Sequence, residues 1–523
     1  AERRLLAVNH KVEHVLDGLR DRHHALLVRL GHHGGVLLLV ALLMVGAGAV
    51  SALSLGREYF PHVDAGQVRL QVRLPTGLRL EETAQRLADI QREIRDIVPA
   101  SELQTVYEQI GIPDAVNLAW VDSAVVGSFE AEVMLQLRSP HGPSADYLAK
   151  IRERVAQKYP DVKVFERPPD ATSRTLAGSA VGALEVRVNG RDAAGNLVLA
   201  RELESRLRQV PGAVDVMLRQ VLDLPEYYIA IDRTRAAQLG ISAQDANRAV
   251  LAVLGSAGTV SPVYWVDQAN ATSYTVQVQA PPASLSGIET LLNTPLRIGE
   301  DGQTVLLRNI AQVSPRTVPA SVGRTMMAPT VSVMANVQGT DLGAVYSALG
   351  DIVKEMESRL KPGNRIEIVG QAGEMQNAYG ELAAGLLMSA VLVFLVLVVN
   401  FQSWIQPLVA MSGLPIAIAG AAVGLLVTGT PLSVPALMGV MMVIGVPPAN
   451  SVLATSFARG LIADGHDPEQ AAYEAAAVRL RPVLMTASAM VLGIIPMALG
   501  LGEGGEQNAP LGRAVIGGLL FGT

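Results

Sequence analysis

Long apolar stretches at two places in the chain constrain its fold more than any other feature of the sequence. Residues 34–55 contain no charged side chain. Four further apolar stretches follow, at residues 382–399, 408–427, 436–457 and 482–499. Because a membrane-crossing helix needs about 20 predominantly apolar residues, we predict five complete spans. A sixth begins near Ala514 and runs into the last residue, Thr523, so we expect the chain to be a fragment of a longer protein.

The region between the first span and the others has the composition of a water-soluble domain. The chain is 50% hydrophobic and 17% charged overall, but its apolar residues concentrate in the spans. Arginines precede the first span and gather again at Arg459, Arg479 and Arg481. Since positive charge accumulates on the cytoplasmic side, we expect residues 57–379 on the opposite, periplasmic side. The sequence has no cysteine, so this domain has no disulfides.

A strand followed by an amphipathic helix recurs in the aqueous region. Residues 67–74 alternate apolar and polar, and apolar residues then recur at helical spacing up to Ile97. The same unit returns with strands at residues 129–137, 184–188 and 331–337. Four such units predict paired α+β modules of the ferredoxin-like βαβ type. Residues 227–307 lie between the third and fourth units and are interpreted as an inserted subdomain.

Two groups of residues could suggest metal binding. Six histidines lie near the amino terminus: His10, His14, His23, His24, His32 and His33. Their spacing fits no ligand template, so a solvated interfacial helix is the preferred interpretation. Met326 and Met327 could bind a soft cation through their thioethers, but no third methionine stands beside them. We therefore predict no metal site, no cofactor and no nucleic-acid partner.

Several separated motifs resemble those of a resistance-nodulation-division (RND) efflux permease. Tyr59-Phe-Pro-His-Val-Asp-Ala-Gly66 is similar to the Phe-Pro-x-x-Asp-x-Gly signature of that family, and Leu74-Pro-Thr-Gly77 to the Leu-Pro-x-Gly that follows it. Arg479-Leu-Arg-Pro-Val-Leu-Met-Thr486 resembles the opening of the eleventh membrane helix. The basic segment before the first span matches the linker between the two halves. The chain thus resembles the carboxy-terminal half, of the hydrophobe/amphiphile efflux type.

The resemblance implies an inner-membrane pump driven by inward proton flow. Such pumps are homotrimers that work with a periplasmic adaptor and an outer-membrane channel, and we expect the same partners here, together with membrane lipid. The five spans contain no central Asp or Glu, and an arginine does not titrate. The titrating acids would therefore come from the other half. The resemblance assigns the relay residues of this half to Asn450, Arg479 and Thr486.

Two features depart from the pattern of the best-known drug pumps in this family. Ala449 stands where those pumps have a lysine, just before Asn450. Pro447 and Pro448 remove two backbone donors in the middle of a span, which predicts a kinked or broken helix. Such breaks are tolerated where the backbone lines a polar cavity. A broken helix beside the proton site and a peculiarity without function remain equally open alternatives.

The predicted substrate path follows from the resemblance and from the aromatic content. Residues 109–128 lie where the substrate-facing loop of the family falls, and Tyr107, Trp120 and Phe129 are the nearest aromatic residues. Core packing is the plainer explanation for Phe129. Few phenylalanines lie in the periplasmic region, which favours an amphiphilic, weakly aromatic substrate. Heavy-metal cation efflux and a non-pumping scaffold subunit are the alternatives.

The expected domain organisation follows the same order. The fold class is a membrane α-helical bundle with a large periplasmic α+β region. The expected segments are a cytoplasmic linker helix (1–33), the first span (34–56), a periplasmic porter module (57–170), a second porter module in two parts (171–220 and 313–375), an inserted docking subdomain (221–312) and a truncated helix block (376–523).

Overall fold

The computed structural model describes residues 18, 20–29, 31, 33–112, 125–169, 174–175, 180–256, 260–281, 287–298, 304–502 and 504–523. Two compact units make up the chain. The first consists of Ala1–Pro75, Arg79–Gln220 and Val322–Thr523, and the second of Thr76–Leu78 and Val221–Ser321. The first unit holds the membrane helices and two α+β modules.

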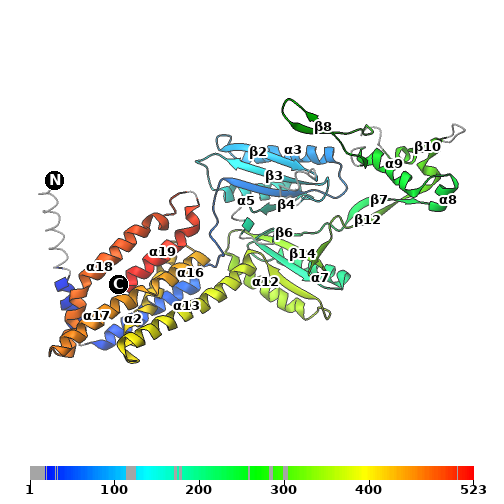
Figure 1. Cartoon of the computed structure of the whole chain (residues 1–523). Coiled ribbons are helices and arrows are strands. Elements are labelled where there is room, and N and C mark those ends of the chain that lie inside the picture. Colours follow the sequence, from blue (N-terminus) through cyan, green and yellow to red (C-terminus); the bar gives the residue numbers. More distant parts are fainter. Residues whose placement is uncertain are drawn as a thin grey trace. The chain divides into compact units, whose positions relative to one another are not determined.

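The membrane helices of the first unit confirm the predicted spans. Among the described residues, five helical segments are long and apolar enough to cross a membrane. They are α2 (Gly34–Ser54), α13 (Gln371–Phe401), α14 (Ile405–Ala410) with α15 (Leu414–Val427), α16 (Val434–Val443) with α17 (Val446–Ala463), and α18 (Pro468–Ala498). A further helix, α19 (Gly505–Gly522), follows. Figure 1 shows these helices gathered in a bundle.

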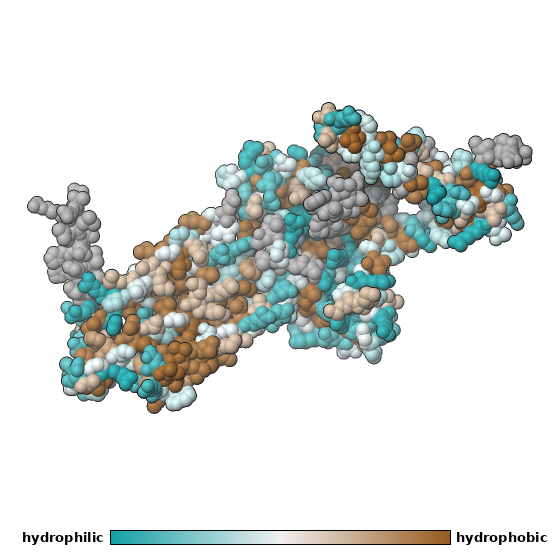
Figure 2. All heavy atoms as spheres, viewed as in Figure 1, coloured by the Kyte–Doolittle hydropathy of each residue, from teal (hydrophilic) through white to brown (hydrophobic). Residues whose placement is uncertain are grey.

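Large apolar side chains cover the outside of this bundle. Leu38 and Leu43 on α2 are each 63% exposed, and Leu387 on α13 is 70% exposed. Figure 2 shows hydrophobic residues spread over the surface of the helices. Apolar side chains exposed in such number indicate a surface that faces lipid.

Small residues let the helices approach one another inside the bundle. A Cβ on Gly517 of α19 would lie 2.5 Å from the carbonyl oxygen of Gly420 and 2.9 Å from Cα of Gly424, both on α15. Without a hydrophobic driving force in lipid, such backbone contact is a main source of helix association. α15 and α19 are therefore closely packed at these glycines.

Two helix boundaries differ from the sequence prediction. α18 begins at Pro468, not at Pro482, and keeps Pro482 inside the helix. Asp467 caps its amino terminus by accepting hydrogen bonds from the N–H groups of Glu469 and Gln470. The prediction followed the apolar run, and the first turns of α18 are polar. For the same reason α19 begins at Gly505, before the expected start near Ala514.

The first α+β module is a four-stranded antiparallel sheet with two helices. Its elements are β1 (Gln67–Arg73), α3 (Leu80–Ile97), β2 (Leu103–Ile110), β3 (Glu130–Leu137), α5 (Ser144–Lys158) and β4 (Lys163–Arg167). The strand order is β2-β3-β1-β4. This is the predicted ferredoxin-like arrangement. Leu70 of β1 and Ile90 of α3 are each 1% exposed and belong to its core.

The second module repeats this topology with an insertion. Its elements are β5 (Leu184–Asn189), α7 (Ala193–Leu207), β6 (Ala213–Leu218), β13 (Gly323–Thr325), β14 (Ala328–Val337), α12 (Leu342–Glu357) and β15 (Arg365–Val369). β14 pairs with β5, β6 and β13, and β15 pairs with β5. Leu203 of α7, Val186 of β5 and Leu349 of α12 share one core cluster. The four predicted strand–helix units are confirmed.

The second unit is inserted into the chain of the second module between β6 and β13. It contains β7 (Leu224–Ile231), α8 (Arg233–Gln238), α9 (Ala243–Gly255), β8 (Val263–Asp267), β9 (Thr272–Val276), α11 (Ile288–Leu292), β10 (Pro295–Ile298), β11 (Thr304–Leu306), the 3-10 helix η2 (Leu307–Asn309) and β12 (Ala311–Val318). β7 and β12 pair along their whole length. A small core of Ala236, Ile241, Ala246 and Ile310 holds its helices.

Candidate transport path and proton-relay site

Charged residues form a buried layer on one face of the first module's sheet. Val68, Leu70 and Val72 point to one face of β1, so Arg69, Gln71 and Arg73 point to the other. That second face is also buried, with Arg69 4% and Gln71 3% exposed. Arg69 pairs with Glu132 of β3, and Arg73 pairs with Glu130. The charges stay in the interior because each is paired with its opposite.

The second module contributes polar residues to the same region. The guanidinium of Arg73 donates hydrogen bonds of 2.8 and 2.9 Å to the carbonyl oxygens of Leu218 and Arg219. On β5, Glu185 is fully buried and pairs with Arg187 at 3.0 Å and with Arg219 at 3.3 Å. The polar face of each sheet lies opposite its apolar core, so charged side chains line the zone between the modules.

A cavity of about 510 Å³ lies beside this zone. Its polar lining includes Glu58, His62, Arg152, Glu166 and Gln338. Its apolar lining includes Phe60, Leu148 and Val337. The volume falls in the range of small-ligand sites. With Arg167 as a second arginine, the cavity combines carboxylates, one imidazole and two guanidinium groups with apolar side chains.

The signature residues before β1 have a structural role next to this cavity. The carboxylate of Asp64 accepts hydrogen bonds from the N–H groups of Ser144 at 2.8 Å and Gly66 at 3.1 Å. Ser144 is the first residue of α5, so Asp64 holds the amino terminus of that helix. Gly66 has a φ of +66°, a left-handed conformation that favours glycine. These contacts explain the aspartate and glycine of the motif without a role in transport.

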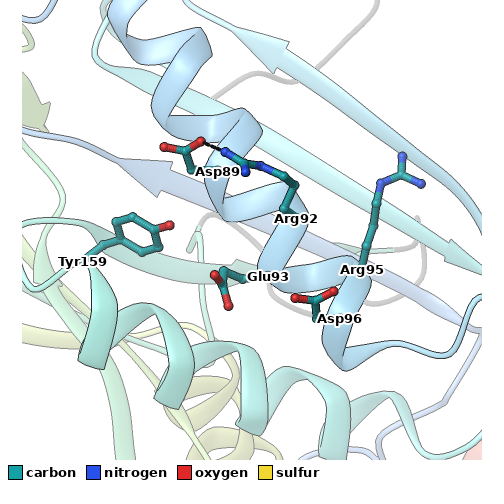
Figure 3. A pocket seen from close by; sticks show the side chains of 6 residues that line it. All are labelled: Asp89, Arg92, Glu93, Arg95, Asp96 and Tyr159. Carbon is teal, nitrogen blue, oxygen red and sulfur yellow. Dashed lines mark hydrogen bonds and ion pairs between the residues drawn. The ribbon is translucent and has the colours of Figure 1, made fainter.

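A second hollow, of about 500 Å³, lies on the helical side of the first module. Figure 3 shows Asp89, Arg92, Glu93, Arg95 and Asp96 along α3, with Tyr159 across from them. Asp89 pairs with Arg92, and Glu93 pairs with two basic residues of α5, Arg154 at 2.9 Å and Lys158 at 2.5 Å. The two ion pairs of Glu93 join α3 to α5, which is a structural function, whereas the Asp89–Arg92 pair lies within α3.

The predicted relay residues lie on α17 and α18, which are in contact. The guanidinium carbon of Arg479 lies 5.8 Å from the centre of the Phe457 ring. Within the described part of the chain, its Nε is buried without a hydrogen-bond partner. The hydroxyl of Thr486 donates to the carbonyl oxygens of Pro482 and Val483, at 3.2 and 3.0 Å. Asn450 is half-buried on α17. In the part of the chain that the structure describes, no hydrogen bond joins any two of these three side chains, so their shared role stays a prediction.

The helix that carries the two prolines is interrupted. α16 ends at Val443 and α17 begins at Val446, so Pro447 and Pro448 lie in the first turn of α17. In that turn the backbone N–H groups have no partner inside the helix, which makes proline acceptable there. Both prolines are buried. Asn450 follows after Ala449, within the second turn of α17.

The predicted substrate-path residues have different surroundings. Tyr107 on β2 is 54% exposed. Phe129 is 1% exposed, and its carbonyl oxygen accepts a hydrogen bond from Leu74, so it belongs to the core of the first module. Trp120 lies outside the described residues. A contact of these residues with substrate stays a prediction.

The buried charged layer was not predicted from the sequence, although a signal for it is present there. The polar positions of residues 67–74 hold two arginines, and those of residues 130–136 hold two glutamates. Opposite charges on strands of one module could have predicted paired charges on one sheet face. In the described part of the chain, no three His, Cys, Asp or Glu side chains are grouped to hold a metal ion.

Five apolar helices and a large α+β region among the described residues define a class of integral membrane protein with a large region outside the lipid. The sequence model of the AcrB/AcrD/AcrF family matches residues 2–523, and the chain belongs to this family of RND inner-membrane transporters. The resemblance to the RND family noted from the sequence is thereby confirmed, whereas the hydrophobe/amphiphile efflux type is not shown by this match.

Similar proteins of known role come from heavy-metal resistance. The cobalt-zinc-cadmium resistance protein CzcA of Cupriavidus metallidurans is 26% identical over 511 residues, which cover 96% of this chain and 47% of that protein. The nickel-cobalt-cadmium resistance protein NccA of Alcaligenes xylosoxydans xylosoxydans is 28% identical, over 99% of this chain and 48% of its own length. The chain spans about half the length of these relatives.

A solved structure supports the same relationship. A crystal structure of a heavy metal efflux pump superimposes with a TM-score of 0.80 at 26% identity, and the match covers 97% of this chain and 51% of that one. A second crystal form gives a TM-score of 0.78. The similarity thus extends over both the membrane helices and the periplasmic modules.

Proposed function

We propose that the full-length protein containing this chain exports heavy-metal cations across the cell envelope and is driven by inward proton flow. The observation that carries this proposal is the match of almost the whole chain to a heavy metal efflux pump, at a TM-score of 0.80. The relatives CzcA and NccA point to the same substrate class. These relatives favour the cation alternative of the sequence analysis over its first choice, amphiphile export.

The chemistry of the periplasmic region supports a cationic substrate. Glu58, Glu166 and His62 line the cavity between the two periplasmic modules. Carboxylate oxygen and imidazole nitrogen are ligands that zinc and its neighbours accept. The proposed cation is a transported substrate, which must be released again. A path with several low-affinity binding sites therefore suits transport better than one high-affinity site.

Proton coupling is assigned to α17 and α18. We infer that Arg479 stabilises deprotonated acids supplied by the other half of the full-length protein, and that Thr486 and Asn450 pass or orient the proton. A buried guanidinium nitrogen without a partner in the described residues supports this role, because buried donors are normally satisfied. The helix is interrupted just before Val446, a few residues ahead of Asn450, and a break of this kind supports the proposal of a polar pocket there.

Amphiphile export is a second candidate that one observation favours. The cavity wall also contains Phe60, Leu148 and Val337, and the described residues hold no grouped metal ligands. A weakly aromatic amphiphile would fit such a wall. A scaffold subunit without pumping activity is a third candidate, motivated by Ala449 in place of the lysine of drug pumps.

The assembly is inferred from the family. We propose a homotrimer in the inner membrane that works with a periplasmic adaptor and an outer-membrane channel. In this assembly, residues 1–33 would be the linker helix, 57–170 the first porter module, and 171–220 with 313–375 the second. Residues 221–312 would be the docking subdomain, directed toward the channel.

Transport by the purified full-length protein in liposomes tests these alternatives. An imposed proton gradient should drive movement of Zn²⁺, Co²⁺ or Cd²⁺, followed with a trapped metal-sensitive dye. Detergents and fluorescent amphiphiles, supplied to the same liposomes, should move more slowly. Faster amphiphile transport would favour the second candidate, and no gradient-dependent transport of either class would favour the scaffold.

A further inference from the structure

Arg152 and Asp215 join the two periplasmic modules. Arg152 is on α5 of the first module, and Asp215 is on β6 of the second. Nε and Nη2 of Arg152 donate to the two carboxylate oxygens of Asp215 at 2.7 and 2.6 Å. This two-pronged geometry is the strongest form of a guanidinium–carboxylate pair. The side chains are 14% and 3% exposed, so water screens the pair poorly.

The backbone at Asp215 is adapted to hold its carboxylate in place. Its φ of +56° is left-handed, which is uncommon for a residue other than glycine. The pairing of β14 with β6 is also irregular there, between Met334 and Asn336. Strained backbone of this kind persists where the surroundings hold it, and it is enriched at functional positions.

Every oxygen of this carboxylate has a donor. Besides Arg152, Oδ2 of Asp215 accepts from the backbone N–H of Glu166 at 3.1 Å and from Nδ2 of Asn336 at 2.9 Å. Arg152 in turn donates to Gln338 of the second module at 2.7 Å and to Glu166 of its own module at 3.0 Å. Several of these hydrogen bonds thus connect the two modules, and each of them involves Arg152 or Asp215.

The ion pair lies between an apolar contact and the cavity. Phe165 of the first module packs in one cluster with Met217 and Met334 of the second. Arg152, Glu166, Asn336 and Gln338 line the cavity wall. Separation of the modules would thus break the ion pair and enlarge the cavity at the same time.

We propose that Arg152 and Asp215 form a releasable latch between the periplasmic modules, and that the latch opens when substrate enters or leaves the adjacent cavity. The proposal rests on the proposed transport function. An ion pair suits this role because water that enters hydrates both separated charges and so offsets the free energy lost when the pair breaks. Separating a continuous apolar contact brings no such gain. The latch is a conformational device and does not itself bind substrate.

Reversible cross-linking in the full-length protein tests whether the latch must open. Arg152→Cys and Asp215→Cys would be joined by a bifunctional methanethiosulfonate reagent, since this chain has no cysteine of its own. Cross-linking should reduce proton-driven transport roughly tenfold, and a reductant should restore it. The matched control joins Arg154→Cys to Glu93→Cys, an Arg–Glu pair inside the first module. Full transport by the cross-linked latch would overturn the proposal.

A second measurement needs no transported substrate. Leu148 lines the cavity and is 3% exposed, so alkylation of Leu148→Cys reports opening of the modules. Asp215→Asn and Arg152→Gln should each raise the alkylation rate roughly tenfold, because either change leaves a buried partner unpaired. Glu93→Gln should leave the rate unchanged. An unchanged rate in both latch variants would refute the latch even if transport of metal cations is established, and an increased rate would support it even if they are not the substrate.

Discussion

The backbone N–H of Leu342 donates a hydrogen bond of 3.2 Å to Oε1 of Glu58. Leu342 begins α12 of the second periplasmic module, and Glu58 follows the first membrane helix. The hydroxyl of Tyr379 on α13 donates to the carbonyl oxygens of Glu58 at 3.0 Å and Leu432 at 2.6 Å. Asp341 accepts from the N–H of Arg57 at 2.9 Å. These bonds join the ends of membrane segments to one periplasmic helix.

Glu58 should make stability depend on pH near neutrality. Burial raises the pKa of its carboxyl from 4.5 to about 7, the hydrogen bond from Leu342 opposes this, and the nearby Asp341 adds to it. Because the folded pKa is the higher one, the stabilising contribution is complete below pH 4.5 and is lost as pH rises through about 7. A shift of this size corresponds to about 3 kcal/mol at most.

Glu58→Gln should therefore raise the unfolding temperature of the full-length protein at pH 8 and change it little at pH 4.5. Glutamine stays neutral and its side-chain oxygen still accepts from Leu342. Thermal unfolding followed by tryptophan fluorescence at both pH values measures the difference. Glu357→Gln, at an exposed position of α12, is the control. An equal shift at both pH values would show that ionisation of Glu58 is not the cause.

If Arg479 and Thr486 belong to the proton relay, their substitution should greatly reduce transport while the protein still folds and reaches the membrane. Arg479→Ala and Thr486→Ala should each reduce proton-driven efflux by about tenfold or more, because the first removes the charge that stabilises the deprotonated acids and the second the hydroxyl that orients the proton. Thr486→Ser keeps the hydroxyl and should retain most activity. Arg481→Ala, two residues from Arg479 and exposed, is the control for lost positive charge. Normal efflux by both alanine variants in membranes would remove these residues from the relay.

Tyr107 and Phe129 should respond differently to truncation. Phe129→Ala removes a core ring and should destabilise the first module by about 3–5 kcal/mol. Tyr107→Ala changes an exposed side chain, so stability should stay within about 0.5 kcal/mol. Denaturant unfolding and transport would be measured on the same preparations. A transport defect in Tyr107→Ala at normal stability would support its place in the substrate path, and normal transport would exclude it.

The turn at Met326 and Met327 offers a test of the thioether hypothesis. Both residues have positive φ, +47° and +68°, in the two-residue connection between β13 and β14. Asn-Gly is the favoured sequence for such a turn, so Met326→Asn with Met327→Gly should stabilise the protein by about 1–2 kcal/mol. Leucine at both positions removes sulfur and keeps the strain. If both variants transport Zn²⁺ and Cu⁺ normally, the thioethers are not a cation site.

The module topology could be predicted from periodicity alone, whereas the latch could not. Residues 67–74 and 331–337 alternate with the strand period, and the helices after them carry one apolar face. Asp215 and Arg152 are 63 residues apart, and neither stands in a recognisable motif. Their contact depends on how two separately folded modules meet, which no local pattern records.

The membrane spans show the same division. The lengths of the apolar stretches predicted the number and position of the spans, because a helix needs about 20 predominantly apolar residues to cross the hydrocarbon core of a bilayer. The helices α18 and α19 contain almost all of the predicted spans but begin before them, since a helix continues past the apolar run wherever capping and backbone hydrogen bonds allow.

The sequence by itself determined the classes of local structure and the family, because apolar periodicity, span length and ordered motifs are properties of neighbouring residues. Only the tertiary structure decided that the polar face of β1 is buried. Arg69 and Gln71 look solvent-facing in the alternating pattern, yet the chain folds back and covers them, and their charges or dipoles are matched by partners on other strands. A strand face is buried only when another part of the chain packs against it. Which part does so is decided by contacts between residues far apart in the sequence.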